Sequence, residues 1–186
     1  MVDQQSEITY IKRILDGETH LFSYFLDNYS HQVFSMIVRI VSSREDAEEL
    51  TQDTFLKAYR KLDTYRGDCS FSTWLFRIGY NTAISSVRKR KLVFPAIDDT
   101  LMNSIPDETV DILSGISENE EMLRQMEQAI GRLNPYEKAL ITLYYLQNKP
   151  VQELSEIFGI GVENVKVRLF RTRKKLYGWI NSNIQS

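Results

Sequence analysis

Residues 150–176 read PVQELSEIFGIGVENVKVRLFRTRKKL. Apolar side chains recur at helical spacing up to Phe158, and the glycines at 159 and 161 predict a tight turn. A longer helix, rich in Lys and Arg, follows this turn. A short helix, a turn and a basic helix in this order are typical of a helix-turn-helix, whose second helix enters the major groove of DNA.

The basic helix has two contrasting sides on a wheel of 100° per residue. The apolar side, which we expect to pack on the preceding helices, carries Val162, Val165, Leu169, Leu176 and Ile180. The opposite side and its flanks carry Glu163, Asn164, Lys166, Val167, Phe170, Arg171 and Lys174. Arg and Lys can pair with phosphates or bind guanine edges, and Asn can read adenine. The alternative is a terminal amphipathic helix with a solvated basic face.

The rest of the chain is also helical by its apolar pattern. Apolar stripes follow one another over residues 8–15, 21–41, 43–62 and 71–90, with Gly17 and Arg66-Gly67 as breaks. Capping patterns begin further helices at Ser117, at Asn134-Pro135 and at Pro150. No strand-like alternation of useful length occurs, so the sequence predicts an all-α protein.

Charge is distributed unevenly along the 186 residues, although the net charge is only −2. Residues 94–131 carry nine acidic side chains against one basic, and residues 162–186 carry six basic against one acidic. Local charge decides where a polyanion binds. We therefore predict two small helical domains, residues 1–93 and 117–186, joined by an acidic flexible linker at 94–116 that holds two of the four prolines.

Several classes of protein are excluded by composition. The N-terminus has no signal-peptide pattern, and no apolar stretch is long enough to insert in a membrane. One cysteine, Cys69, forms no internal disulfide, which suits the cytoplasm. With His20 and His31 it makes no metal-ligand spacing. Because no catalytic triad, carboxylate pair or phosphate-binding glycine loop is present, we expect neither an enzyme nor a cofactor.

The segment Asp46–Arg90, DAEELTQDTFLKAYRKLDTYRGDCSFSTWLFRIGYNTAISSVRKR, resembles region 2 of extracytoplasmic-function sigma factors, which recognise promoters for bacterial RNA polymerase. Residues 133–175 resemble region 4 of the same family. The residues that carry the first resemblance are Asp46, Ala47, Leu50, Gln52, Phe55, Arg66, Gly67, Phe71, Thr73, Trp74, Leu75, Ile78 and Asn81.

The resemblance implies a polymerase-binding helix. Its acidic and amide side chains would dock on the clamp helices of the β′ subunit, while region 4 would meet the β flap. The residues concerned are Asp46, Glu49, Gln52 and Asp53. Without the resemblance, a solvated acidic helix face would be the preferred interpretation.

The resemblance also implies that one base of the opened −10 element is flipped into a pocket at the loop 66–70 and the helix after it. Candidates for stacking, base contact and phosphate contact are Tyr65, Arg66, Phe71, Arg77, Tyr80, Asn81, Arg88, Lys89 and Arg90. Periodicity alone places Phe71 and Trp74 on the apolar stripe, where they would belong to the core.

The −35 element would be read as duplex by Asn164, Lys166, Val167, Arg168, Phe170, Arg171 and Lys174. At the positions of Glu163 and Val167 many family members have small or hydroxyl residues. These departures leave the role of the helix unchanged, but the promoter sequence it reads cannot be taken from the family. The resemblance places the acidic linker along the RNA-exit path, and a plain solvated tether explains its charge equally well. The family also implies an anti-sigma partner.

We therefore predict a sigma factor that binds core polymerase and directs promoter-specific initiation. Two other hypotheses fit parts of the sequence. A helix-turn-helix regulator would act without being a polymerase subunit and would not need the segment 46–90. A helical adaptor would bring its basic helix, with Phe170 beside Arg171, to an acidic protein or membrane surface.

Overall fold

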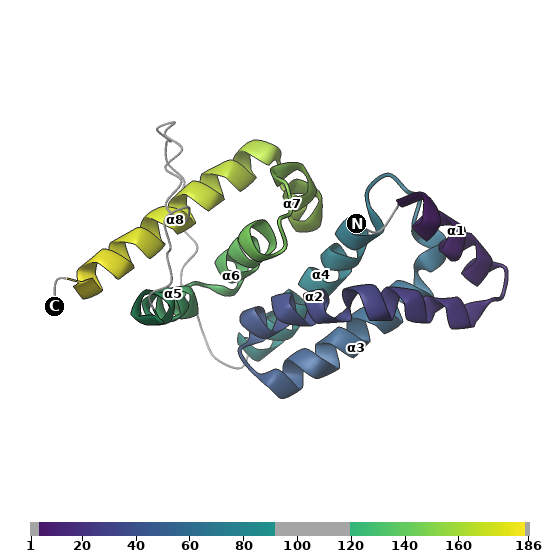
Figure 1. Cartoon of the computed structure of the whole chain (residues 1–186), viewed down its shortest axis with the longest axis horizontal. Helices are drawn as coiled ribbons and strands as arrows, with labels where there is room; N and C mark the ends of the chain where they lie inside the picture. Colours follow the sequence, from purple (N-terminus) through teal and green to yellow (C-terminus); the bar gives the residue numbers. More distant parts are fainter. Residues whose placement is uncertain (1–3, 92–119, 185–186) are drawn as a thin grey trace.

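The computed structural model describes residues 4–91 and 120–184, and every regular element in these two ranges is helical (Figure 1). The elements in order are α1 (Gln4–Leu15), η1 (Thr19–Phe22), α2 (Ser23–Val41), α3 (Arg44–Arg60), η2 (Leu62–Thr64), α4 (Phe71–Lys91), α5 (Glu120–Arg132), α6 (Pro135–Ile141), η3 (Thr142–Leu146), α7 (Val151–Phe158) and α8 (Val162–Ile184). The all-α prediction is confirmed for these ranges. The expected linker at 94–116 and the cap at Ser117 lie outside them.

Caps and glycines set the helix boundaries, as the sequence predicts. The hydroxyl of Ser43 accepts a hydrogen bond from the backbone N–H of Asp46 at 3.2 Å and starts α3. Gly17 follows α1 with a φ of +111°, and Gly159 ends α7 with a φ of +64°, both in the left-handed region that glycine tolerates.

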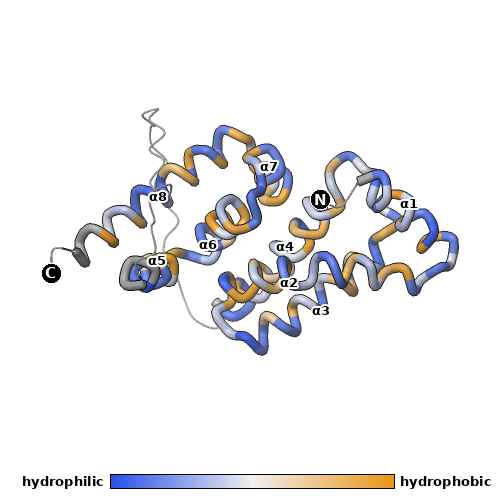
Figure 2. Tube along the Cα trace, viewed as in Figure 1, coloured by the Kyte–Doolittle hydropathy of each residue, from blue (hydrophilic) through white to orange (hydrophobic). Residues whose placement is uncertain are grey.

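Helices α2, α3 and α4 pack against one another and form the centre of the N-terminal domain. Hydrophobic residues recur along these helices (Figure 2), and Phe25, Met36, Phe71, Leu75 and Phe76 are completely buried. Burial of such side chains contributes about 1.5–3 kcal/mol each. Helix α1 covers one end of this group through η1 and η2.

Gly79 allows α4 to approach its two neighbours closely. A Cβ at this position would lie 3.1 Å from Cε of Met36 on α2 and 3.4 Å from Cγ2 of Thr54 on α3. Glycine in a helix interior costs up to about 1 kcal/mol relative to alanine. Close packing of the three helices explains why the chain carries a glycine there.

The C-terminal domain consists of α5 to α8. Asn134 and Glu137 form the predicted capping box at the start of α6, with hydrogen bonds of 2.9 and 3.3 Å. On α8 the expected apolar stripe is buried at Val165, Leu169 and Leu176. Thr172 is buried in the same stripe. Its hydroxyl keeps a hydrogen-bond partner there, because it donates to the carbonyl of Arg168 at 2.8 Å.

The two domains touch each other. Helix α6 packs on α2 and α4, and α7 packs on α4 (Figure 1). The buried apolar residues of both domains belong to one continuous cluster. Helix α4 therefore has neighbours on two sides, its own domain and the C-terminal domain.

The capping box yields a stability prediction. Replacing Asn134 with Ala removes the side-chain acceptor and should cost about 1 kcal/mol, whereas Asn134→Asp keeps an acceptor and should cost much less. Urea unfolding followed by circular dichroism measures both. Equal midpoints for the two variants would contradict the role of this cap.

Candidate nucleic-acid and polymerase interface

The predicted polymerase-binding residues lie along one face of α3, here called the acidic face: Asp46, Glu49, Gln52 and Asp53. Glu49, Gln52 and Asp53 are exposed. Asp46 is half-buried, and its carboxylate accepts a hydrogen bond from Arg90 at 2.5 Å. This bond and burial have opposing effects, and the bond prevails to hold the pKa of Asp46 below its ordinary value.

Two exposed apolar side chains, Leu56 and Tyr59, lie beside the acidic face, and the sequence analysis did not predict them. Leu56 is 53% exposed and Tyr59 is 40% exposed, although α3 has a buried side available. A helical wheel carries the signal, because Leu56 follows Glu49 by seven residues and therefore shares its face. A hollow of about 390 Å³ between α2 and α3 lies beside Gln52. The face thus offers charge, apolar surface and a recess to a partner.

The loop 65–70 is held in a closed turn before α4. The phenolic hydroxyl of Tyr65 donates to the carbonyl of Cys69 at 2.7 Å, and Gly67 has a φ of +80°. Ser70 then caps α4 by accepting from the N–H of Thr73 at 3.2 Å. Around this turn the candidate −10 residues Arg66, Arg77 and Asn81 are exposed.

Phe71 is a core residue in this structure. Its ring is fully buried and packs on Phe25 at a centroid distance of 4.1 Å. It therefore presents no face to a base, as its apolar periodicity indicates. Trp74 is half-buried instead and lies 5.5 Å from the Tyr65 ring. The available aromatic surface at the loop is that of Tyr65 and Trp74.

Tyr80 and Arg88, two further −10 candidates, are engaged by the C-terminal domain. Tyr80 is only 7% exposed, because the rings of Phe158 and Tyr136 lie against it at 4.7 and 6.3 Å. Arg88 donates two hydrogen bonds to the hydroxyl of Tyr136, at 2.9 and 2.6 Å. Burial, with Tyr136 nearby, raises the pKa of Tyr80. Lys89 and Arg90 are exposed at the end of α4.

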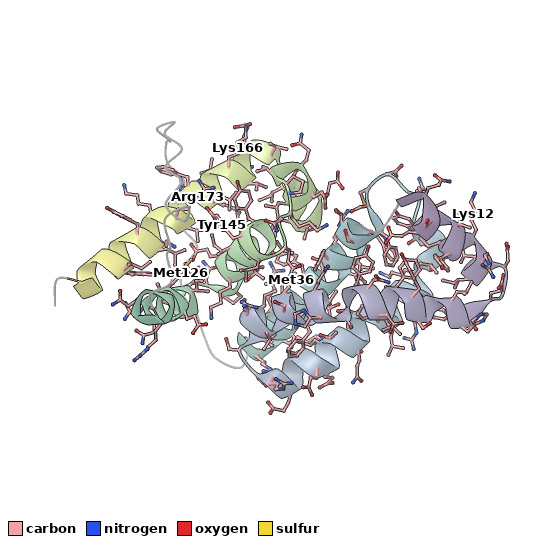
Figure 3. The ribbon with its side chains drawn as sticks, in the orientation of Figure 1. Lys12, Met36, Met126, Tyr145, Lys166 and Arg173 are labelled. Carbon is pink, nitrogen blue, oxygen red and sulfur yellow. The ribbon has the colours of Figure 1, made fainter. Side chains whose placement is uncertain are left out.

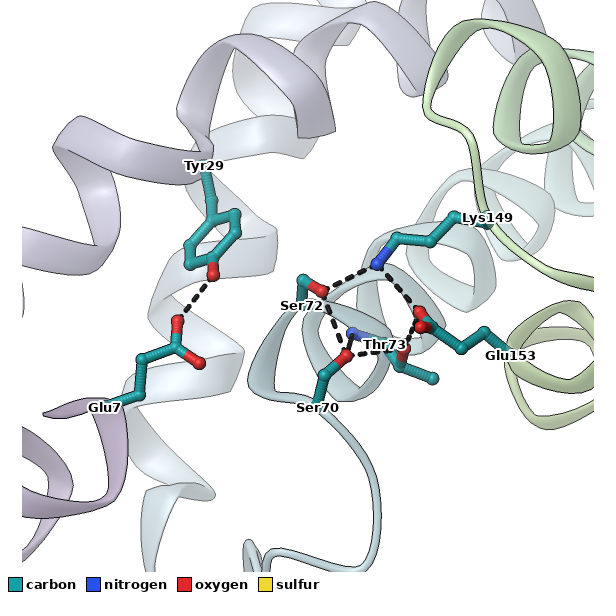
Figure 4. Close-up of polar contacts among 7 residues, drawn as sticks. All are labelled: Glu7, Tyr29, Ser70, Ser72, Thr73, Lys149 and Glu153. Carbon is teal, nitrogen blue, oxygen red and sulfur yellow. Dashed lines mark hydrogen bonds and ion pairs between the residues drawn. The ribbon is translucent and has the colours of Figure 1, made fainter. Parts of the chain in front are cut away.

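A set of polar side chains joins the first turn of α4 to α7 (Figure 4), and we call Ser70, Ser72, Thr73, Lys149 and Glu153 the interdomain cluster. Lys149 donates to Ser72 at 2.7 Å and to Glu153 at 2.8 Å. The hydroxyl of Thr73 donates to the same Glu153 carboxylate. Burial opposes the charge of Glu153, but the bonds from Lys149 and Thr73 prevail and lower its pKa.

An open cavity of about 520 Å³ lies between the loop and α7. Tyr65, Arg66, Trp74 and Arg77 line it from the N-terminal domain, and Glu156 lines it from α7. Cys69 also faces this cavity. Burial, and then the carboxylate of Glu156, raise the pKa of the Cys69 thiol to about 11.

The candidate −35 residues lie along α8. Asn164, Lys166, Arg168 and Lys174 are exposed, while Val167, Phe170 and Arg171 are half-buried. Lys166 lies on the outer side of α8 (Figure 3) and pairs with Glu163 at 2.8 Å. Arg173, by contrast, stacks on Tyr144 and Tyr145, with its guanidinium 5.6 and 5.8 Å from the ring centres.

The described part of the chain holds neither a candidate metal site nor a candidate membrane-spanning helix. Residues 4–91 and 120–184 contain no grouping of three or more His, Cys, Asp or Glu arranged to hold a metal ion. None of their helices combines the length and apolar character needed to cross a bilayer.

A helix-turn-helix with an exposed basic face, joined to a helical domain with a closed loop and an acidic face, defines a DNA-binding protein that also has a surface for a protein partner. Family models match both parts: Sigma-70 region 2 covers residues 25–93, and Sigma-70, region 4 covers residues 123–176.

Relatives match almost the whole chain. The ECF RNA polymerase sigma-E factor of Salmonella typhi is 32% identical over 182 residues, with 95% of each chain covered. The RNA polymerase sigma-H factor of Pseudomonas aeruginosa is 29% identical, covering 95% of this chain and 94% of its own. The chain belongs to the extracytoplasmic-function group of the sigma-70 family, and it is an RNA polymerase sigma factor.

Solved structures share the fold. CnrH in complex with the cytosolic domain of CnrY aligns with a TM-score of 0.67 and 20% identity, covering 94% of this chain and 96% of that one. RpoE in complex with the anti-sigma factor NepR from Bartonella quintana aligns with a TM-score of 0.64 and 21% identity, covering 86% and 96%.

The thiol of Cys69 gives a pH-dependent prediction. Its pKa of about 11 should make alkylation by iodoacetamide at pH 8 about a hundredfold slower than in the urea-unfolded chain, because the thiolate is the nucleophile. Folding is favoured by this neutral thiol below its ordinary pKa, and the contribution is lost as the pH rises toward 11. Alkylation that titrates at the ordinary thiol pKa in the folded chain would contradict the environment described here.

Proposed function

We propose that this sigma factor binds core polymerase through the acidic face of α3, binds the opened −10 strand at the loop 65–70 and α4, and reads the −35 duplex with α8. The observation that carries the proposal is that α3, the loop with α4, and α8 each present exposed side chains with the chemistry of a different partner. The acidic face suits an Arg-rich partner, and the two basic surfaces suit DNA.

Helix α8 has one side suited to the major groove of DNA. Its apolar stripe is buried against its own domain, so the side that carries Asn164, Lys166 and Arg171 is the side left to face DNA. Side chains on a recognition helix read base edges in the major groove, and Arg and Lys also neutralise phosphates. Val167 can touch a thymine methyl, and Glu163 can accept from a cytosine amine.

Promoter opening requires no covalent chemistry in this proposal. Unstacking one base costs a few kcal/mol of free energy. Stacking on aromatic side chains and contacts to the base edge in a pocket must offset this cost. Tyr65 and Trp74 supply aromatic surface at the cavity beside the loop, while Arg66 and Arg77 supply charge for phosphates. Binding energy for the opened strand then shifts the duplex toward the open state.

The partners and place of action follow from the same proposal. The chain acts in the cytoplasm on polymerase and promoter DNA, as a subunit without catalytic activity of its own. RpoE from Bartonella quintana was solved with an anti-sigma factor, and we propose an anti-sigma partner for this chain as well. A regulator independent of polymerase would leave the acidic face of α3, with exposed Leu56 and Tyr59, without a role.

The direct test is transcription by purified bacterial core polymerase from a randomised promoter library, with and without the protein. Starts that require the protein and share two motifs at a fixed spacing are expected. If no start depends on the folded protein and it does not co-elute with core polymerase, the proposal is wrong.

The acidic face can be tested separately. Asp53→Lys reverses one exposed charge on α3 and should weaken co-elution with core polymerase about tenfold, an effect typical of a charged pair at an interface. Asp16→Lys makes the same charge change at an exposed position after α1 and serves as the control. Equal retention of both variants by core polymerase would remove Asp53 from the interface.

The duplex-reading side of α8 can be tested with Arg171. We expect Arg171→Ala to weaken binding at the selected −35 motif by about 1–3 kcal/mol relative to a scrambled motif, as for a base-edge contact. Lys175, whose ammonium pairs with Glu137 at 2.5 Å, is the matched control. Its replacement by Ala should change both affinities alike. The measurement is fluorescence anisotropy on the two duplexes, and an unchanged preference in Arg171→Ala would rule out base reading by this residue.

A further inference from the structure

Helix α1 buries an acidic side chain near the loop 65–70. Glu7 is only 3% exposed and precedes the buried Ile11 and Ile14 by four and seven residues, so it occupies the first position of an apolar stripe. Burial of a carboxylate costs free energy unless hydrogen bonds replace the lost water, and Glu is among the residues least often buried. An apolar side chain would complete the stripe without this cost. The carboxylate therefore points to a directional contact.

The Glu7 carboxylate accepts a hydrogen bond from Tyr29 on α2 (Figure 4). The Tyr29 hydroxyl donates to Oε1 of Glu7 at 2.5 Å, and Tyr29 itself is only 7% exposed. Burial, followed by this hydrogen bond, raises the pKa of Tyr29, so the hydroxyl keeps its proton and remains a donor at physiological pH. A short bond between two buried groups holds the tyrosine ring in one orientation.

The Tyr29 ring leads directly to the aromatic side chains of the loop. Its centre lies 5.9 Å from that of Phe71, and Phe71 in turn lies 5.7 Å from Tyr65 and 5.6 Å from Trp74. Tyr65 and Trp74 line the cavity beside the loop, and we call them the cavity rings. Because protein interiors are close-packed, neighbouring rings constrain one another. The orientation of Tyr29 therefore bears on that of the cavity rings.

Helix α1 also contacts the turn of the loop. A Cβ on Gly67 would lie 3.9 Å from Cδ1 of Ile8, so the residue next to Glu7 lies against this turn. Burial, then Cys69 and then Glu7 raise the pKa of Tyr65 to about 12, which places Glu7 close to this ring as well. Neither Glu7 nor Ile8 is among the described residues that line the cavity. Their influence on a bound base must therefore pass through the loop.

We infer that Glu7 is a positioning residue for base capture: through its bond to Tyr29 it holds the cavity rings in the arrangement that receives the base unstacked from the −10 element. The inference rests on the proposed function of the loop 65–70. It adds a residue on α1, outside the loop and α4, that determines how well the pocket works. A pre-arranged pocket needs less ordering when the base enters, so losing the arrangement weakens the binding of that base.

The experiment measures how much a single base contributes to strand binding. Holoenzyme assembled with bacterial core polymerase is titrated into labelled single-stranded oligonucleotides that carry the −10 motif selected in the transcription assay. Each base in turn is replaced by an abasic site, and the ratio of the two affinities gives the contribution of that base. Because this base ratio compares two ligands on one protein, a smaller folded fraction leaves it unchanged.

Three variants break or keep the bond. Glu7→Leu removes the carboxylate but keeps a side chain of similar size, whereas Glu7→Gln keeps an oxygen that can accept from Tyr29. At the most sensitive base, the ratio should fall about tenfold in Glu7→Leu, as for loss of one base–aromatic stack, and stay within about twofold of the native value in Glu7→Gln. Tyr29→Phe removes only the hydroxyl and should resemble Glu7→Leu, so it decides the test if Glu7→Leu folds poorly.

The matched control for lost stability is Ile40→Ala. Ile40 is 3% exposed on the same helix as Tyr29 but eleven residues further along, which is about 16 Å. Its truncation should lower the melting temperature of the protein and leave the base ratio at the native value. A fall in Glu7→Leu and Tyr29→Phe, with native ratios in Glu7→Gln and Ile40→Ala, supports the inference.

Trp74→Ala separates failure of the inference from failure of the proposed function. If Trp74→Ala lowers the base ratio while Glu7→Leu and Tyr29→Phe keep it, the loop captures a base without help from Glu7, and the inference is wrong. An equal fall in Ile40→Ala also overturns the inference, because general loss of stability then explains the effect. If Trp74→Ala leaves the ratio unchanged, the loop 65–70 is not the site of capture, and the proposed function fails together with the inference.

Discussion

Helix α4 has to bury one side in the N-terminal domain and leave another side for a partner, and the rest of the structure depends on how it meets both demands. Phe71, Leu75 and Phe76 anchor the buried side, and Gly79 lets α2 and α3 come close. The loop 65–70 and the basic end of α4 are held in place by this packing. A binding surface on a rigid helix requires less ordering when its partner arrives.

The outer side of α4 has more than one candidate partner. In the free chain it meets α6 and α7, through a mixture of aromatic contacts and charged hydrogen bonds. The contact is also apolar, because the buried residues of both domains belong to one cluster. The acidic face of α3 lies apart from this contact, so it remains available for the polymerase while the domains are closed.

Local features were predictable because they depend on neighbours in sequence. The cap at Ser43, the capping box at Asn134 and the turn at Gly159 all follow from short patterns, and so does the buried stripe of α8. The resemblance in residues 46–90 supplied the family, which the relatives confirm. Periodicity placed Phe71 and Trp74 on one stripe, but their different burial depends on how the loop folds over them.

Contacts between the domains could not be predicted from the sequence. Lys149 and Ser72 are 77 residues apart, and Thr73 and Glu153 are 80 apart. No local pattern marks such pairs, and each residue alone fits an ordinary cap or helix surface. Leu56 and Tyr59 are different, because an apolar residue on a polar helix face is visible on a helical wheel.

The contact between the two domains can be tested by measuring the distance between them. Pulsed electron paramagnetic resonance would measure it between spin labels at Asp27→Cys on α2 and Glu127→Cys on α5, both exposed positions, in a Cys69→Ser background. We expect one narrow distance distribution in the free chain and a shift to longer distances when core polymerase and promoter DNA are added. A broad distribution in the free chain, or the same narrow one in the complex, would contradict this expectation.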